Sequence, residues 1–294
     1  MEWLSPVTWR RGWTNKAVIG IMDSMPAQLE KIFTSRLLLA VNILIIILTE
    51  ASGEWFHDTG IIHLVAILFV CLGISCILTR RSVYDQYLQP LIRGGSAALL
   101  IFALSHLVEY VSFLRLHSYD DVLYVNVVNF YLISILAFTA GAEYFIHTVK
   151  RSSHKMFLFL WAGILLFFFL TILFFFGYAD ISIDPEHMTP YVYGAVVISI
   201  SALSMNHLRK IKSLVGIMSG FINYFQSALA LITVSALLYI FYELIEDAGM
   251  PEFQIIYISH FLFYGALSFM FLAFAKLSHL GGLYDEVEAY RHRS

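Results

Sequence analysis

The sequence alternates between long apolar runs and short polar connections along almost its whole length. With about 20 residues as the length that crosses a lipid bilayer, these runs predict eight transmembrane helices. The predicted spans are 36–50, 61–79, 96–116, 124–149, 156–178, 189–208, 217–244 and 252–277. Residues 1–35 are expected to form an amphipathic interfacial segment, and 278–294 a short tail. The pattern therefore predicts an all-α, polytopic integral membrane protein.

The charged residues of the connections are sorted by sign. Of the 18 Lys and Arg residues, all but Arg115 fall in five clusters that alternate along the chain with four acidic connections. The basic clusters are Arg10–Arg36, Arg80–Arg93, Lys150–Lys155, Arg209–Lys212 and Lys276–Arg293. Short loops rich in Lys and Arg stay on the cytoplasmic side of a membrane. Both termini, with the segment 1–35 and the tail, are therefore predicted to be cytoplasmic, and the expected location is an inner or plasma membrane.

The composition narrows the possible functions. Hydrophobic residues make up 59% of the chain and charged residues only 13%, which is too little charge for the surface of a water-soluble domain of this length. The longest stretch outside the predicted spans, 1–35, is too short for a catalytic or nucleotide-binding domain. We expect lipid and other membrane subunits as partners, and no nucleic acid.

Ionisable residues inside the predicted spans carry the candidate chemistry, because such groups are costly in hydrocarbon and by default indicate a functional site. His106 and Glu109 lie at i and i+3 on one face of the third span. Glu143 and His147 lie at i and i+4 on the fourth span, nearer the cytoplasm. His260 on the eighth span and His63 at the outer end of the second complete the set of candidate residues: His63, His106, Glu109, Glu143, His147 and His260.

Two kinds of cofactor are consistent with these residues. A transition metal can bind His106, Glu109, His260 and His63, which are all expected in the outer half of the bundle. Alternatively, a b-type haem can take His106 and His260 as axial ligands, with Arg115 pairing with a propionate. Glu109 and Glu143 differ by roughly 15 Å in expected depth and cannot share one metal. A second pair, His147 with His207, lies near the inner surface, where a His needs no ligand.

The buried acids suggest a third kind of chemistry, namely proton transfer. Glu109, Glu143 and His147 form the predicted relay, in which a proton from the cytoplasm meets His147 first and Glu143 next. Both carboxyl groups are expected to point into the bundle and to have a hydrogen-bond partner there. The simpler alternative for each His or Glu is a hydrogen bond to a neighbouring helix.

The sequence is consistent with several functions. The first is a subunit for electron transport or quinol interaction that holds a redox cofactor or metal in the outer half of the bundle. The alternatives are a sensory or structural module that acts through partner proteins, and a proton or small-ion transporter that uses the buried Glu residues. Because all six prolines lie in the N-terminal segment, in loops or at helix ends, the broken helices of many transporters are not expected. Whether the chain is an enzyme stays undecided, although a metal-dependent intramembrane enzyme is one possibility.

Overall fold

The computed structural model describes residues 61–79, 86–116, 121–150, 155–177, 182, 184–277 and 287, and within these ranges every regular element is a helix. In chain order the elements are α4 (Ile61–Thr79), η1 (Gln86–Leu88), α5 (Gln89–Leu116), α6 (Asp121–Lys150), α7 (Lys155–Phe175), α8 (Thr189–Leu214), η2 (Gly216–Met218), α9 (Ser219–Ile240), α10 (Tyr242–Asp247) and α11 (Glu252–Leu277). The all-α class is confirmed for this part of the chain. The predicted span 36–50, the segment 1–35 and, apart from Val287, the tail lie outside the described residues.

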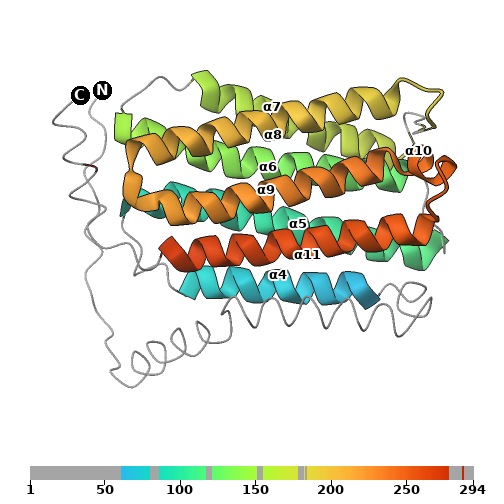
Figure 1. The fold of residues 1–294 in the computed structure, drawn as a ribbon, viewed down its shortest axis with the longest axis horizontal. Coiled ribbons are helices and arrows are strands. Elements are labelled where there is room, and N and C mark those ends of the chain that lie inside the picture. The colour runs from blue at the N-terminus through green and yellow to red at the C-terminus, as the bar shows by residue number, and fades with distance from the viewer. Residues whose placement is uncertain are drawn as a thin grey trace.

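The long helices lie side by side in one bundle and alternate in direction (Figure 1). Helix α6 packs against α5, α7, α8 and α9, while α11 packs against α9 and α4. The most apolar window of α6 is 89% buried, whereas that of α7 is only 22% buried. Helix α6 is therefore the centre of the bundle and α7 is peripheral. The outer face of α7 carries large apolar side chains: Leu158, Phe159, Leu165, Leu166 and Phe169.

Six of the described helices are long and apolar enough to cross a membrane, namely α5, α6, α7, α8, α9 and α11. Helix α4 adds 19 residues without an Asp, Glu, Lys or Arg and packs against α5. Apolar helices of this length indicate a multi-pass membrane protein.

The observed helices extend beyond several of the predicted spans. The predicted spans 61–79 and 252–277 match α4 and α11, but α5 begins seven residues before its predicted start and α8 continues six residues past its predicted end. Apolarity marks the part of a helix that lies in lipid, whereas backbone hydrogen bonding continues into polar sequence. Pro90 is tolerated in α5 because it lies in the first turn, where no intrahelical N–H partner is lost. The predicted span 217–244 is divided at Phe241 into α9 and α10.

The alternating helix direction gathers charges of one sign at each end of the bundle. The starts of α5, α7 and α9 lie at the same end as the finishes of α4, α6, α8 and α11 (Figure 1). This end carries the basic residues of the described helices with the exception of Arg115, and they include Arg93, Lys150, Lys155, Lys212 and Lys276. The opposite end carries acidic residues, which include Asp184, Glu243, Glu246 and Asp247.

Candidate metal centre

Helix α5 supplies two adjacent polar side chains to the interior of the bundle. His106 and Glu109 are three residues apart, so they lie on the same helical face. Both are buried, with 0% and 1% of their surface exposed. The Nδ1 atom of His106 lies 2.8 Å from the Oε2 atom of Glu109. This pair is the one that the i and i+3 spacing predicted.

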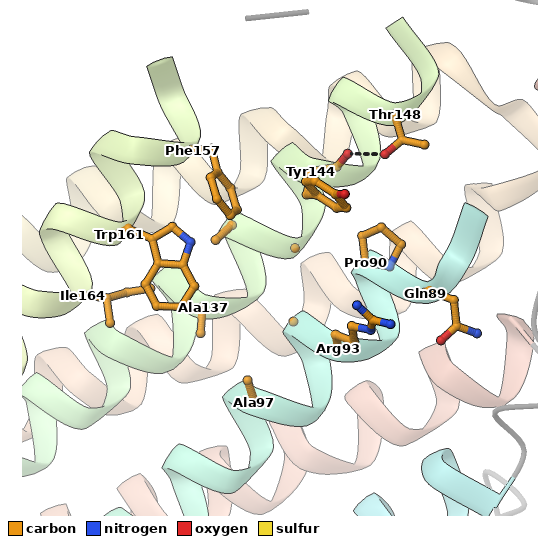
Figure 2. Close-up of a pocket in the computed structure, with 13 residues that line it drawn as sticks. Gln89, Pro90, Arg93, Ala97, Ala137, Tyr144, Thr148, Phe157, Trp161 and Ile164 are labelled. Carbon is orange, nitrogen blue, oxygen red and sulfur yellow. Dashed lines mark hydrogen bonds between the residues drawn. The ribbon is translucent and has the colours of Figure 1, made fainter. Parts of the chain in front are cut away.

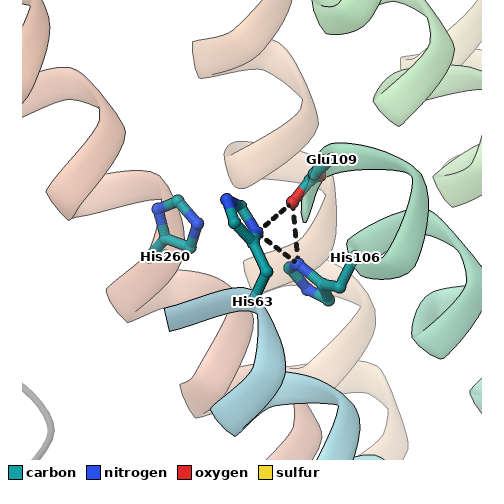
Figure 3. A group of neighbouring side chains, drawn as sticks. All are labelled: His63, His106, Glu109 and His260. Atoms are coloured by element: carbon teal, nitrogen blue, oxygen red, sulfur yellow. Dashed lines mark hydrogen bonds and ion pairs between the residues drawn. The ribbon is translucent and has the colours of Figure 1, made fainter. Parts of the chain in front are cut away.

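Two further helices each bring one imidazole to this pair (Figure 3). His63 lies in the first turn of α4, and its Nδ1 atom is 2.7 Å from Glu109 Oε2 and 3.3 Å from His106 Nδ1. His260 on α11 places its ring centroid 5.5 Å from that of His63 and 6.3 Å from that of His106. One ligand atom from each of the four residues lies within 4.8 Å of the others. We call these four residues the His3Glu cluster.

The hydrogen bonds of the His3Glu cluster leave polar atoms unsatisfied. The Oε2 atom of Glu109 lies within hydrogen-bond distance of both His63 and His106. In contrast, Glu109 Oε1 and His106 Nε2 are buried and have no hydrogen-bond partner among the described residues. A buried polar atom without a partner costs about 1–3 kcal/mol. The cluster is therefore able to accept a further ligand at both atoms.

The distances between the donor atoms are close to those of a metal site. Bonds of about 2.0–2.1 Å from zinc to nitrogen or oxygen place neighbouring tetrahedral ligands on the order of 3.3 Å apart. The measured separations of 2.7, 2.8 and 3.3 Å within the His63, His106 and Glu109 set require only small shifts to reach that value. The donor set of three imidazoles and one carboxylate matches the nitrogen and oxygen ligands of zinc and of other first-row transition metals.

Aromatic side chains separate the His3Glu cluster from the rest of the bundle. The ring of Phe263, on α11, meets the His106 ring edge to face with centroids 4.5 Å apart. Phe263 in turn stacks on Tyr131 of α6 at 5.5 Å, and Phe102 of α5 contacts both rings. All of these side chains are buried. An apolar shell of this kind excludes water and strengthens electrostatic interactions inside it.

The second predicted acid, Glu143, takes a different partner from the one that the sequence suggested. Its Oε2 atom lies 3.1 Å from Nε2 of His207 on α8. The Nδ1 atom of His207 lies 2.8 Å from the backbone oxygen of Leu203, so an Nδ1 proton is held there and Nε2 faces the carboxyl group. The sequence analysis had paired His207 with His147. The spacing along α6 gives no information about α8, and the pairing of His207 with Glu143 was therefore missed.

The structure separates the remaining predicted residues. His147 is half-buried on α6, and its ring centroid lies 6.5 Å from that of Tyr144. Glu109 and Glu143 each pair with a different set of His residues, and both are buried. Both acids therefore lie inside the bundle, each with a His nitrogen within about 3 Å of its carboxyl group. Arg115 lies on α5, six residues after Glu109, but its side chain lies outside the described part of the structure.

No protein-family model, no curated protein and no solved structure matches this chain. The chemistry of the site therefore rests on its own residues.

Proposed function

We propose that this chain is an integral membrane protein that holds a transition-metal ion inside its helix bundle, at the His3Glu cluster. The observation that carries the proposal is the convergence of four buried ligand atoms within 4.8 Å from three different helices. Three imidazoles and a carboxylate in an apolar bundle are costly to bury. A bound cation compensates that cost, because it takes the lone pairs of the imidazoles and neutralises the carboxylate.

The burial of the cluster favours a structural or an electron-transfer role for the ion. Structural metal sites take all four ligands from the protein, whereas hydrolytic sites leave one position to water. With four protein ligands and a dry aromatic surround, the ion ties α4, α5 and α11 together. A redox-active ion at the same place also serves electron transfer, which is the role that the sequence analysis put first.

A b-type haem between His106 and His260 is the less favoured cofactor. The rings of His63, His106 and His260 form a triangle with centroid separations of 5.6, 5.5 and 6.3 Å. His63 therefore lies beside the line that joins the other two rings. A porphyrin centred on that line would extend into the space of the His63 ring. A single metal ion needs no such space and gains His63 as a ligand.

The proposed topology has eight spans, with both termini in the cytoplasm and the chain in an inner or plasma membrane. The charge alternation along the sequence supports it, as does the grouping of Lys and Arg at one end of the described bundle. In this orientation the His3Glu cluster lies in the outer half of the membrane.

Metal content of the purified protein tests the proposed function. We expect about one equivalent of metal per chain by plasma mass spectrometry, because the cluster forms a single four-ligand site. His106→Ala, His260→Ala and Glu109→Gln should each lose it. The matched control is His187→Ala, since His187 is 59% exposed and remote from the cluster in sequence. Visible spectra of the oxidised and dithionite-reduced protein distinguish a redox-active ion or haem from zinc. Metal that persists in all three cluster variants would contradict the proposal.

Proton transfer is a second candidate function, because Glu143 and His207 form a buried acid–base pair near the basic end of the bundle. Such pairs mark proton pathways in many membrane proteins. Glu143→Gln keeps the shape of the side chain and removes its titration. Loss of proton-coupled activity in reconstituted vesicles would support the relay, and unchanged activity would leave the pair a contact between helices. The sensory or structural module stays an alternative prediction.

A further inference from the structure

A cavity of about 670 Å³ lies between α5, α6 and α7, near the basic end of the bundle (Figure 2). Its volume falls in the range of about 300–1,000 Å³ that is typical of small-molecule sites. The cavity lies around Arg93 and Ala97 of α5, roughly 18–24 Å along the helix from Glu109 at 1.5 Å per residue. It is therefore separate from the His3Glu cluster.

Small residues create this cavity. Helices α5 and α6 approach so closely that a Cβ atom on Gly94 would lie 2.9 Å from the Cα atom of Gly141. Ala97, Ala137 and Ala140 continue the small surface on both helices. Side chains of this size leave the space in front of the α5–α6 contact unfilled, and α7 covers only part of it.

The cavity is lined mostly by apolar side chains, and its polar residues, Arg93, Gln89 and Thr148, lie at its basic end. Phe157 and Trp161 of α7 and Tyr144 of α6 line its sides (Figure 2). Arg93 is exposed and lies near the start of α5, and it has no hydrogen bond or ion pair with any other described residue. Trp161, which lines the cavity, is 47% exposed. The arrangement is therefore amphipathic, with a guanidinium group at one end and an aromatic and aliphatic hollow behind it.

We propose that this cavity binds a membrane lipid with an anionic headgroup. The phosphate pairs with Arg93, whose guanidinium matches phosphate oxygens with two parallel hydrogen bonds. One acyl chain fills the hollow between α5, α6 and α7. The basic end of the bundle faces the cytoplasm in the proposed topology, where anionic lipids give the membrane surface its negative potential. The cationic residue at the basic end and the apolar cavity beside a lipid-facing helix thus both favour an anionic lipid.

Quenching of Trp161 by brominated lipids tests this site. A variant in which Trp3, Trp9, Trp13 and Trp55 are changed to Phe keeps Trp161 as its single tryptophan. In vesicles that contain brominated phosphatidylglycerol, we expect Trp161 to be quenched at a mole fraction about fivefold lower than with brominated phosphatidylcholine. One basic residue near an anionic membrane surface contributes about 1 kcal/mol to binding, and this free energy corresponds to a factor of about five.

Three variants identify the origin of the preference. Arg93→Gln should equalise the two lipids, whereas Arg209→Gln, which removes an exposed cation from α8 at the same end, should leave the preference intact. Ala137→Leu, which narrows the cavity and keeps Arg93, should also reduce it. Equal quenching by both lipids in the parent protein would show that Trp161 meets only bulk lipid and would overturn the proposal. A preference that survives Arg93→Gln would overturn it as well.

Native mass spectrometry provides an independent measurement on the chain with all five tryptophans. Retention of phosphatidylglycerol over phosphatidylcholine in the parent protein, lost in Arg93→Gln, would support the site. Equal retention of both lipids would count against it. A bound neutral, non-phosphorylated lipid or quinone in place of the anionic lipid would also overturn the assignment.

Discussion

At the residue scale, one carboxylate oxygen organises the His3Glu cluster. Glu109 Oε2 lies within 2.8 Å of imidazole nitrogens from two helices, α4 and α5. Only when Nδ1 of a His carries the proton can it donate to that oxygen. The Nε2 atom of His106 then keeps a lone pair, and it has no hydrogen-bond partner among the described residues. Glu109 thus sets the tautomers of its neighbours, and a cation that binds the His3Glu cluster through these atoms replaces the shared protons.

The pair formed by Glu143 and His207 gives a prediction at the same scale. Glu143→Leu removes the group that faces His207 Nε2, so we expect a loss of on the order of 1 kcal/mol in the free energy of unfolding. Glu143→Gln should recover most of this loss, because its amide N–H can donate a hydrogen bond to His207 Nε2, whose ring carries its proton on Nδ1. Unfolding in detergent, followed by circular dichroism against denaturant, measures both changes. Equal stability of the Leu and Gln variants would mean that the pair contributes nothing to the fold.

At the scale of elements, close contact between α5 and α6 depends on two glycines. A Cβ atom on Gly141 would lie 2.7 Å from the backbone oxygen of Pro90 and 2.9 Å from the Cα atom of Gly94. Both neighbours are backbone atoms, so neither can move unless the helices separate. Small residues of this kind allow membrane helices to approach closely.

The prediction that follows compares the same substitution at two glycines. Gly141→Ala should lower the free energy of unfolding by about 1–3 kcal/mol, because overpacking forces the backbones apart. Gly220→Ala, on α9, should leave stability unchanged or raise it by less than about 1 kcal/mol, since its Cβ would meet open space. Thermal unfolding of both variants in one detergent gives the comparison. A tolerated Gly141→Ala would show that α5 and α6 do not pack as closely as described.

The helices themselves follow from the sequence to a large extent. Spans 61–79 and 252–277 agree with α4 and α11, because polar residues bound each apolar run on both sides. The start of α5 was misplaced by seven residues, since Arg93 and Pro90 interrupt the apolar pattern without interrupting the helix. The break at Phe241 was missed for a related reason. Hydropathy does not report where one helix ends and another begins within a continuous apolar run.

At the scale of the whole molecule, the orientation in the membrane is the first prediction. Reporter fusions at Lys155, Lys212 and Ser294 should report a cytoplasmic location, because the positively charged loops stay inside. Fusions at Asp120 and Asp184 should report the opposite side. An odd number of crossings, or a cytoplasmic reading at Asp184, would contradict the eight-span topology.

Metal-dependent stability is the second prediction at this scale. An ion at the His3Glu cluster links α4, α5 and α11 and binds only the folded chain. We therefore expect a metal concentration 100 times the Kd to stabilise the metal-depleted protein by about 2.7 kcal/mol. A chelator should remove this gain. The thermal midpoint, measured with and without added metal, should respond in the parent protein and in His187→Ala, but not in His260→Ala. An equal response in His260→Ala would place the metal elsewhere.

The sequence by itself determined the helical membrane class, most helix positions and the sorting of charges between the two ends. It also determined that His106 and Glu109 share a face, and it proposed that His63 and His260 join them. These conclusions depend on the spacing of residues along a helix and on the composition of each segment. Both can be read from the sequence, because a chain that crosses hydrocarbon can form only helices or closed barrels.

Only the tertiary structure decided which helices are neighbours. The packing of the helices places His63 and His260 next to His106 and Glu109 of α5. It also makes His207, and not His147, the partner of Glu143, and it leaves the cavity beside Gly94 and Gly141. The physical reason is that lipid tails are as apolar as the helix surfaces, so hydrophobicity does not select one helix pairing over another. Close packing and interhelical hydrogen bonds make that selection, and both depend on residues far apart in the chain.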